Sequence, residues 1–372
     1  MTRSDGPFRI LHIDTESGWR GGEQQVYNLI KGLGNFKVEQ YAAGVKDKEF
    51  LGRISGMVKE TLPLPRCGEL SLSAFLKIAR FSKKNRIDII HSHTAKAHGQ
   101  ALGSLLFNGT PVIAAHRRVD FRIPDNVLKR FKYNFSKTGA VIAISKAIKN
   151  ILESSGVNKE KLRLIYSSVD PDRFWQPSEK AASEIRNEFE IPDNVPVIGN
   201  TAAFAPHKDH ATLLKAASML HEAGVDFRLL LPGDGKLLGD TKKLCRSLGI
   251  SGKVLFPGFR KDLKGFFSLF DIFVNSSSEE GLGTSVIDAL AAGLPVAATS
   301  AGGVPEILDG GKYGLLSPPK DPHGLYLSLN TLIEDPGKRD AFSARARQRA
   351  LFFNIDSMAE KTFSVYKEIL NV

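Results

Sequence analysis

The chain has 372 residues, of which 42% are hydrophobic and 24% are charged, a balance typical of a globular protein. This length exceeds what one hydrophobic core usually supports, so we expect two domains. The two cysteines, Cys67 and Cys245, lie far apart without metal-ligand partners nearby, which disfavours a disulfide scaffold and a zinc ribbon. No apolar run reaches the ~18 residues of a membrane span. Residues 1–14 lack the apolar core and cleavage site of a signal peptide, so we expect a cytoplasmic protein.

The net charge of +11 is unevenly distributed. Residues 1–175 hold 29 Lys and Arg against 16 Asp and Glu, whereas the remaining residues hold 22 against 24. A basic surface can simply keep a protein in solution, or it can attract an anionic membrane face or an anionic acceptor. Nucleic acid is a weaker interpretation, because the aromatic residues near the basic clusters follow no nucleic-acid-binding motif. We therefore expect no nucleic-acid partner.

Short apolar runs alternate with amphipathic stretches along the whole chain. The runs are typical of buried parallel strands, and the stretches between them, such as residues 23–33, are typical of helices. The predicted strands are 8–14, 37–45, 87–93, 111–116 and 140–145 in the first half, and 195–203, 227–233, 253–258, 271–277 and 295–300 in the second. This alternation predicts two doubly wound α/β domains, joined through the polar segment 169–182. Such domains bind ligands at the carboxyl ends of their strands.

Two adjacent glycines, Gly21 and Gly22, follow the first predicted strand and precede a helix. Glycines at a helix start let backbone N–H groups approach an anion closely, assisted by the helix dipole. The spacing differs from the G-x-G-x-x-G dinucleotide fingerprint. Glycines in such a loop can also be purely structural.

His116 ends the predicted strand 111–116. A histidine at a strand end can orient a hydroxyl or a phosphate, or it can be a structural imidazole. Arg117 and Arg118 follow directly, and because adjacent side chains diverge we expect one of the two to face the ligand.

Three further histidines, His91, His93 and His98, raise the hypothesis of a metal site. A catalytic zinc site usually adds an acidic ligand or a His-Glu-x-x-His helix, and neither accompanies these residues. His91 and His93 lie two positions apart at a strand end and so share one face. We expect no metal.

Two carboxylates flank a glycine turn in the stretch "SSSEEGLGTSVIDALAAGLPV", residues 276–296. Glu280 precedes the turn, Thr284 is the predicted N-cap of the following helix, and Gly293 with Pro295 ends that helix. The two carboxylates could be an acid–base pair, a ligand clamp, or ordinary loop and helix residues.

The helix after this turn has one polar face. Thr284, Ser285 and Asp288 share that face by helical spacing, whereas Ile287, Leu290 and Ala291 share the packing face. The free N–H groups of the helix start favour a diphosphate. Asp288, roughly 6 Å further along the axis, is placed to accept hydrogen bonds from ribose hydroxyls, and Glu280 would reach the group beyond the phosphates.

These residues resemble family 4 of the retaining glycosyltransferases, and the resemblance covers nearly the whole chain. Its most specific element is the frame S-x-x-E-G-x-G…E-A-x-A-x-G-x-P-V, which is matched by Glu280, Gly281, Gly283, Ala289, Ala291, Gly293, Pro295 and Val296. Residues 301–316, 199–216 and 20–26 resemble further segments of the family. The resemblance implies a GT-B fold of two facing Rossmann-like domains with an interdomain cleft.

The resemblance also implies a division of labour along the chain. Residues 1–172 would form an acceptor-binding domain and residues 173–354 a nucleotide-sugar-binding domain, and residues 355–372 would form a helix that crosses back to the first domain. By the same match, Glu280 would contact the hydroxyls of the donor sugar, Lys208 the diphosphate, and His116 the donor sugar near the reacting carbon. These three are the predicted catalytic residues.

The remaining predicted donor site comprises Gly21, Gly22, Arg260, Gly281, Leu282, Gly283, Thr284, Ser285 and Asp288, and the predicted acceptor site comprises Lys96, Arg117 and Arg118. Three positions depart from the family pattern. Asp288 replaces the second Glu, Ala203 replaces an Arg that many relatives pair with Lys208, and residues 167–168 replace Asn-Gly. Arg260 is our candidate for the charge missing at Ala203.

The family's reaction retains anomeric configuration and requires no metal or cofactor. The expected donor is a UDP- or GDP-sugar, and the expected acceptor is a glycan or a lipid-linked saccharide of bacterial cell-surface polysaccharide or lipopolysaccharide synthesis. The basic first domain could bring the protein to the inner face of the plasma membrane as a peripheral protein. Two alternatives stay open: a non-catalytic sugar-nucleotide-binding protein, and another GT-B enzyme such as a sugar-nucleotide epimerase.

Overall fold

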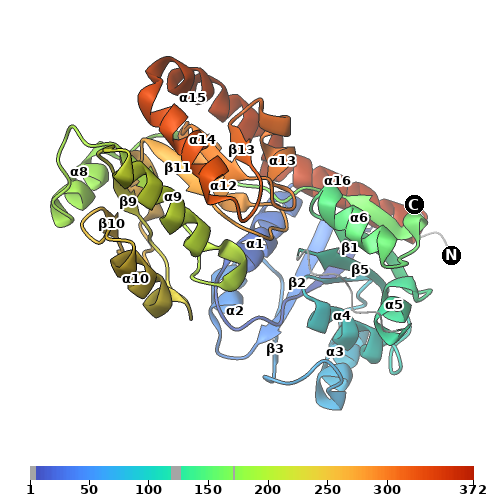
Figure 1. Cartoon of the computed structure of the whole chain (residues 1–372). Helices are drawn as coiled ribbons and strands as arrows, with labels where there is room; N and C mark the ends of the chain where they lie inside the picture. Colours follow the sequence, from blue (N-terminus) through green and yellow to red (C-terminus); the bar gives the residue numbers. More distant parts are fainter. Residues whose placement is uncertain (1–5, 119–126, 171) are drawn as a thin grey trace. The chain divides into compact units, whose positions relative to one another are not determined.

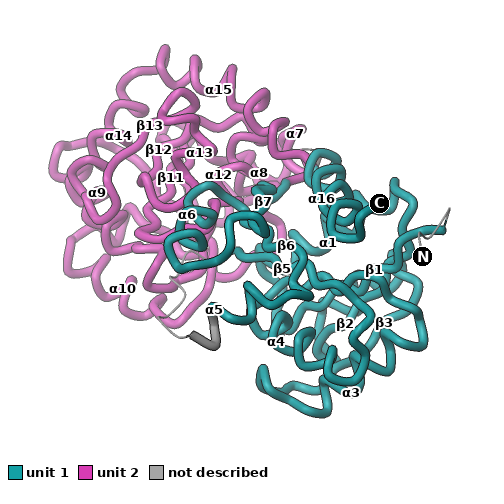
Figure 2. Tube along the Cα trace, turned by 90° about the vertical axis from the view of Figure 1, so that its right-hand side faces the viewer, with its two compact units in different colours: residues 1–168, 355–372 teal, residues 169–354 magenta. Residues whose placement is uncertain are grey.

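The computed structural model describes residues 6–118, 127–170 and 172–372. The chain divides into two compact units, which Figure 2 shows in different colours. Unit 1 consists of residues 1–168 and 355–372, and unit 2 consists of residues 169–354. The division thus falls after residue 168, where the sequence placed it after residue 172, and the C-terminal segment 355–372 lies in unit 1.

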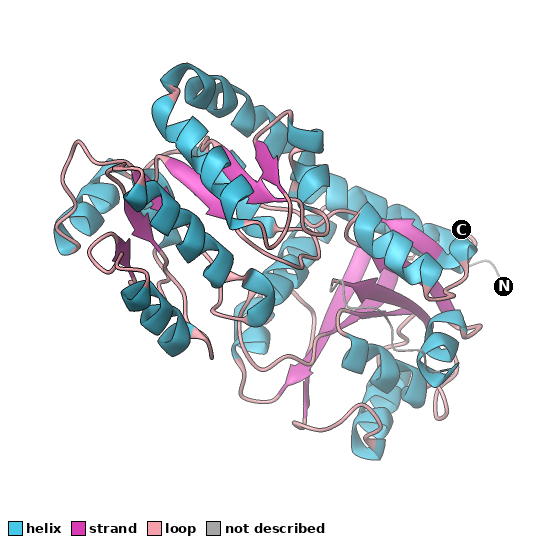
Figure 3. Ribbon diagram, in the orientation of Figure 1, coloured by secondary structure: helices cyan, strands magenta, loops and turns pink. Residues whose placement is uncertain are grey.

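Unit 1 is built on a parallel sheet, whose strands are magenta in Figure 3. The strand order is β3-β2-β1-β4-β5-β6-β7. Its strands are β1 (Phe8–Ile13), β2 (Val38–Val45), β3 (Thr61–Leu64), β4 (Ile89–Ser92), β5 (Val112–Arg117), β6 (Thr138–Ala143) and β7 (Leu162–Leu164). Its described helices are α1 (Gly21–Leu33), α2 (Glu49–Ile54), α3 (Leu72–Lys84), α4 (Ala95–Ser104), α5 (Val127–Asn134), α6 (Lys146–Ser154), the 3-10 turn η1 (Lys159–Lys161) and α16 (Ile355–Leu370). Because all neighbouring strands are parallel, their carboxyl ends meet at one end of the sheet.

The two faces of this sheet have separate cores. On one face, Ile10 and Ile89 pack with Leu29 of α1 and Tyr366 of α16. On the other face, the alternate strand residues Leu11, Ile13, Ile90 and Ile113 pack with Ile78 of α3 and Ala97 of α4. The period-2 alternation of a strand therefore decides which residues α16 covers.

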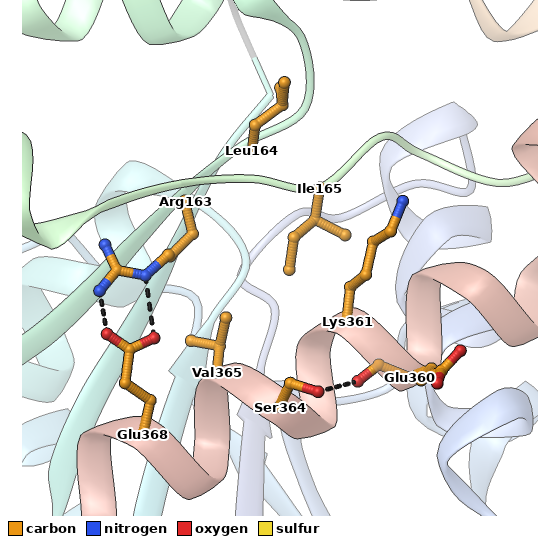
Figure 4. Close-up of a pocket in the computed structure, with 8 residues that line it drawn as sticks. All are labelled: Arg163, Leu164, Ile165, Glu360, Lys361, Ser364, Val365 and Glu368. Carbon is orange, nitrogen blue, oxygen red and sulfur yellow. Dashed lines mark hydrogen bonds and ion pairs between the residues drawn. The ribbon is translucent and has the colours of Figure 1, made fainter.

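The C-terminal helix α16 is fixed to unit 1 by close packing and by charge. A Cβ added to Gly32 of α1 would lie 2.8 Å from the Ala359 Cβ of α16, so glycine allows the two helices to approach. Glu368 of α16 forms an ion pair with Arg163 of β7, beside a surface pocket between these elements (Figure 4). The last residues of the chain thus become part of the first unit.

Unit 2 is built on a second parallel sheet, with the order β10-β9-β8-β11-β12-β13 (Figure 1). Its strands are β8 (Val197–Gly199), β9 (Arg228–Leu230), β10 (Val254–Leu255), β11 (Ile272–Asn275), β12 (Val296–Thr299) and β13 (Leu315–Ser317). Its described helices and 3-10 turns are α7 (Asp172–Trp175), α8 (Glu179–Glu188), η2 (Pro206–Lys208), α9 (His210–Glu222), α10 (Leu238–Ser247), α11 (Leu263–Leu269), α12 (Thr284–Ala292), α13 (Val304–Ile307), η3 (Asp309–Gly311), α14 (Pro322–Glu334), α15 (Pro336–Ala350) and η4 (Leu351–Phe353).

The predicted doubly wound architecture is confirmed in both units, and every predicted strand exists. Sequence reasoning missed β3, β7 and β13, which all lie at sheet edges. Edge strands pair on one side only, so they need fewer apolar residues and tolerate proline, as Pro63 in β3 shows. Their apolar signal is correspondingly weak.

Candidate functional site

In unit 2, the loops after β8 and β11 are joined at the carboxyl end of the sheet. The Ser278 N–H donates to the His207 carbonyl at 2.8 Å, and the Ser276 hydroxyl donates to the Lys208 carbonyl at 2.9 Å. These bonds hold Lys208, the last residue of η2, against the loop that carries Glu280. Strand order thereby brings together two predicted residues that lie 72 positions apart.

Lys208 and Glu280 form a partly buried ion pair. The Lys208 Nζ lies 2.5 Å from the Glu280 Oε2, and the Ser277 hydroxyl donates to the same oxygen at 3.0 Å. The two side chains are 19% and 13% exposed. An ammonium has three N–H donors and a carboxylate has two acceptor oxygens, so the pair can offer donors to an anion and an acceptor to a hydroxyl at neighbouring points.

The loop after β12 closes on the backbone of Glu280. Gly303 donates its N–H to the Glu280 carbonyl at 3.2 Å. Gly302 has a φ of +48°, and a Cβ there would lie 1.6 Å from the same carbonyl oxygen. Only glycine allows this approach, so the position of Glu280 depends on Gly302.

Helix α12 begins beside this loop with no side-chain cap. The predicted N-cap, Thr284, is wrong: Gly283 is the N-cap, with a φ of +99°, and Thr284 is the first helical residue. Sequence reasoning favoured Thr284 because a hydroxyl usually caps a helix, but glycine fits the left-handed backbone of this turn. The helix start therefore leaves backbone N–H groups for an anion. Thr284, Ser285 and Asp288 are all partly exposed on one face, as predicted.

The Asp288 carboxyl on this face has an unusual acidity. Burial raises its pKa from 3.8 to about 7, against the opposing effect of the Arg173 guanidinium. At neutral pH the residue therefore titrates, and it can accept hydrogen bonds fully only above that range. The turn residues Gly281 and Leu282 are buried and shape the loop.

Arg260 is held by two carboxylates. Its guanidinium donates to Asp262 at 3.0 and 2.9 Å and to Glu188 at 2.7 Å, and it packs over the Phe266 ring. A phosphate that bound the Arg260 guanidinium would have to displace both carboxylates. Arg260 is therefore not part of the donor site that we propose.

Sequence reasoning did not include the loop after β9 of unit 2 among the segments that surround the candidate site. A Cβ on Gly233 would lie 2.0 Å from the Ala202 carbonyl oxygen, and one on Gly235 would lie 2.5 Å from the Phe204 carbonyl oxygen. This loop therefore packs directly on the backbone around the exposed Ala203. The signal was available, because Gly-Asp-Gly follows an apolar run directly in the sequence.

In unit 1, Gly21 and Gly22 form the first turn of α1. Arg20 is the N-cap, and its N–H donates to the Glu23 Oε2 at 2.7 Å. A Cβ added to Gly22 would meet no heavy atom of the described chain within 4 Å. The described packing of the protein therefore does not itself require glycine at Gly22.

Ionisable groups are buried beneath this glycine loop. Asp14 is 2% exposed and Glu23 is 3% exposed. Burial raises the pKa of Asp14, and burial together with the Asp14 charge raises the pKa of Glu23 to about 7. Burial lowers the pKa of Arg118 to about 10, although both carboxylates favour its charged form.

Arg118 organises a hydrogen-bonded row of histidines. Its Nη1 donates to the Gly22 carbonyl at 2.9 Å, and its Nη2 lies 3.1 Å from the His93 Nδ1. Arginine only donates, so the His93 proton lies on Nε2 and is donated to the His12 Nδ1 at 3.0 Å. The His12 Nε2–H is donated in turn to the Gln40 Oε1 at 3.2 Å.

This row gives Arg118 an internal role beyond the acceptor contact predicted for it. Arg117 is the last residue of β5, where alternation turns its side chain to the face opposite that of His116. Arg117 and Lys96, the second residue of α4, are both partly exposed. No sequence pattern indicates Gln40 or His12 as partners, because their contacts depend on strand order.

The ring nitrogens of His12, His91 and His93 lie within 4.8 Å of one another, as a metal site would require. Each of their six ring nitrogens already has a protein partner. Burial lowers the pKa of all three rings, and the Arg118 charge contributes for His91 and His93. A cation here would have to break these bonds beside a guanidinium, so the residues fit a neutral network better than a metal centre.

Comparison with known families assigns each of the two units to a glycosyltransferase family model. A model of the glycosyl transferases group 1 matches residues 182–349, and a model of glycosyltransferase family 4 matches residues 19–173. The chain is a glycosyltransferase of the family 4 type. The match with the first model includes Lys208, Glu280 and Asp288, and the match with the second includes Gly22 and His116.

Similar proteins agree with this family 4 assignment. The chain is 27% identical over 303 residues to the glycosyltransferase EpsF of Bacillus subtilis, covering 77% of this chain and 78% of EpsF. It is 25% identical over 331 residues to the lipopolysaccharide core biosynthesis glycosyltransferase LpsE of Rhizobium meliloti, covering 88% and 90%. The solved structure of Anabaena HepE in complex with UDP and glucose matches with a TM-score of 0.85 at 20% identity, covering 97% and 99%. The predicted GT-B fold is thereby confirmed.

Proposed function

We propose that this family 4 enzyme transfers a sugar from a nucleoside diphosphate donor to a hydroxyl of a glycan or lipid-linked acceptor. The observation that carries the proposal is the cluster at the carboxyl end of the unit 2 sheet. There an ammonium, an uncapped helix start and a carboxylate lie in one set of joined loops. HepE, which shares the fold, is described in complex with UDP and glucose.

Each group in this cluster suits one part of such a donor. Lys208 and the first N–H groups of α12 would bind the diphosphate. Glu280 would accept hydrogen bonds from the sugar hydroxyls, and Asp288 from the ribose. The open space above Gly22 would let the backbone of α1 approach a phosphate. His116 would contact the sugar near the reacting carbon.

We further propose that the reaction retains anomeric configuration and needs no divalent metal. The bond from the anomeric carbon to the phosphate oxygen breaks, a bond to the acceptor oxygen forms on the same face, and the acceptor proton passes to the leaving phosphate. The transition state resembles an oxocarbenium ion, so stabilising the departing negative charge is the main task. Lys208 and the start of α12 supply positive potential for that task.

A thermal-shift screen against UDP-, GDP- and ADP-sugars tests the donor class. We expect one class to stabilise the protein, and its slow hydrolysis to release the nucleoside diphosphate with or without EDTA. Binding without any turnover, with every acceptor tried, would favour a non-catalytic binding protein. Conversion of the nucleotide sugar into an epimer would favour an epimerase. Product NMR reads the anomeric configuration directly.

We propose an anionic or membrane-anchored acceptor, in bacterial polysaccharide or lipopolysaccharide synthesis. LpsE is named for lipopolysaccharide core biosynthesis, and the basic charge is concentrated in residues 1–175. Within the described residues, no helix is both long and apolar enough to cross a membrane. We propose that the basic unit 1 makes peripheral contact with a lipid surface.

Unit 1 offers apolar side chains for such a contact. Leu70 is 85% exposed and Phe131 is 58% exposed. Their sequence neighbours Glu69 and Lys132 form an ion pair of 2.8 Å, which joins the two segments that carry these apolar residues. Sedimentation with anionic vesicles should fall in Leu70→Ser with Phe131→Ser. It should be unchanged in Leu327→Ser, a half-exposed leucine of unit 2; equal binding of all variants would contradict the proposal.

A further inference from the structure

A second hydrogen-bonded row of side chains lies in unit 1, beside the one that starts at Arg118. The Tyr366 Oη lies 2.6 Å from the His91 Nδ1, and the His91 Nε2 lies 2.8 Å from the His116 Nδ1. Tyr366 and His91 are fully buried, and His116 is 6% exposed. The row starts on α16, the last helix of the chain, and ends at the carboxyl end of β5.

Sheet register explains why these residues meet. His91 of β4 lies beside Ala114 of β5. His116, two positions after Ala114, therefore points to the same face as His91. That face is the one covered by α16, whose Tyr366 packs in the same core as Ile89 and Ala114.

Each imidazole in this row carries a single proton. Burial lowers the pKa of His91 and His116 well below the usual value, and the Arg118 charge lowers both further. Each neutral ring therefore has one nitrogen that donates and one that accepts. The row can run in only two directions, which differ in whether the His116 proton lies on Nε2 or on Nδ1.

The phenol decides between these directions. Among the described residues, His91 is the partner of the Tyr366 hydroxyl. If His91 donated to the phenol oxygen, the phenol proton would be buried without an acceptor, at a cost that disfavours this direction on the order of tenfold. Tyr366 therefore donates to the His91 Nδ1, and His91 donates from Nε2 to the His116 Nδ1. The His116 proton then lies on Nε2.

We propose that Tyr366 and His91 are positioning residues that fix His116 as an Nε2–H donor, which binds an oxygen lone pair of the sugar and never acts as a base. The Nε2 of His116 has no hydrogen-bond partner among the described residues and is not among their buried unpaired atoms, so it is left for a ligand. The inference rests on the proposed function for the identity of that ligand. The tautomer of His116 can be measured in the protein without any ligand.

The tautomer is read by two-bond ¹H–¹⁵N NMR spectra of the full chain labelled with ¹⁵N-histidine at pH 7.5. A His116→Gln variant assigns its signals by their loss. We expect wild-type His116 to show the Nε2–H pattern, with the Nδ1–H form about tenfold less populated. A wild-type His116 that carries its proton on Nδ1 would overturn the proposal, whether or not Tyr366→Phe folds.

Tyr366→Phe removes the donor while keeping the ring that packs in the core. We expect the Nδ1–H form of His116 to rise severalfold, towards equal populations of the two tautomers. The kcat/KM for the donor should fall in proportion to the remaining Nε2–H form, by up to about twofold. Tyr41→Phe is the matched control: this tyrosine is 2% exposed, lies on the opposite face of the same sheet, and donates to Glu39. It should change neither quantity.

The two proposals fail in distinguishable ways. An unchanged His116 tautomer in folded Tyr366→Phe would overturn the role of the tyrosine, even if the enzyme transfers sugar normally. An Nε2–H tautomer that shifts in Tyr366→Phe, in a protein that neither binds nor turns over any nucleotide sugar, would support the positioning role and refute the proposed function.

Discussion

The carboxyl ends of the two sheets bear different chemistry. In unit 1 they carry buried, neutral imidazoles, in which each histidine is held by other protein groups. In unit 2 they carry a lysine and a glutamate that are charged and partly exposed. A fully buried group must be neutral or internally paired, so unit 1 offers fixed and directional donors. Partly exposed charges can exchange partners, so unit 2 offers groups that a charged ligand can recruit.

The largest effect should come from the carboxylate of unit 2. Glu280→Gln keeps the shape but removes the charge that balances Lys208 and that we propose accepts from sugar hydroxyls. We expect turnover to fall about 10²–10³-fold, the usual cost of losing one preorganised electrostatic group. Initial rates of nucleoside diphosphate release measure it. Glu279→Gln, at the exposed neighbouring position, should retain activity; equal losses in both variants would contradict a specific role.

Removing the cation of the same pair should be the next largest effect. Lys208→Gln should lower kcat/KM for the donor by about 10²-fold, because it removes the group that we propose stabilises the leaving phosphate charge. Lys215→Gln changes an exposed lysine of α9 in the same unit and provides the control. Normal donor kinetics in Lys208→Gln would remove the basis for placing the diphosphate here.

Backbone contact at Glu280 can be tested with two glycines. Gly302→Ala would place a Cβ 1.6 Å from the Glu280 carbonyl oxygen, whereas Gly310, also at positive φ (+65°), has open space around it. We expect Gly310→Ala to lower the free energy of unfolding by about 1 kcal/mol through backbone strain alone. Gly302→Ala should cost about 3 kcal/mol and should also reduce turnover. Urea denaturation and initial rates measure the two quantities; similar behaviour of the variants would refute the contact.

Asp288 should give the site a pH dependence. Its pKa is raised from 3.8 to about 7, so the folded state holds this proton more tightly than the unfolded chain. Its stabilising contribution is full below about pH 4 and is lost as pH rises towards 7. Donor affinity should change in the opposite sense and increase as pH rises through 7, because the carboxylate would then accept hydrogen bonds from the ribose of the proposed donor.

The Asp288→Asn variant isolates this dependence, because Glu23 of unit 1 has a pKa in the same range. We expect the increase of affinity between pH 6 and 8 to flatten in Asp288→Asn and to persist in Asp288→Glu. Isothermal titration at several pH values measures it. A wild-type affinity that is independent of pH would contradict the ribose contact.

Arg260→Ala should have the smallest effect. Because Glu188 and Asp262 hold its guanidinium, we expect donor kcat/KM to change by less than about threefold, as for other surface ion pairs. A loss comparable with that of Lys208→Gln would show instead that Arg260 leaves its carboxylates and replaces the charge missing at Ala203.

The sequence alone predicted the two doubly wound domains, because buried parallel strands are continuous apolar runs. It also predicted Glu280, Lys208 and Asp288 as neighbours of one ligand through spacing and family resemblance, and the structure joins the first two in one ion pair. It misplaced the cap of α12 by one residue, because the preference for a hydroxyl cap is weaker than the need for glycine at positive φ. It missed the edge strands for lack of apolar signal.

Local pattern thus determined the elements, the order of strands and helices, and the residue types at the strand ends. The tertiary structure alone decided which of those strand ends lie side by side. His91 meets His116 and Tyr366, 25 and 275 positions away, because strand order and the return of α16 bring them to one face. Hydrogen-bond direction, and with it the position of a proton, is a property of such contacts between distant residues, and spacing along the chain does not encode it.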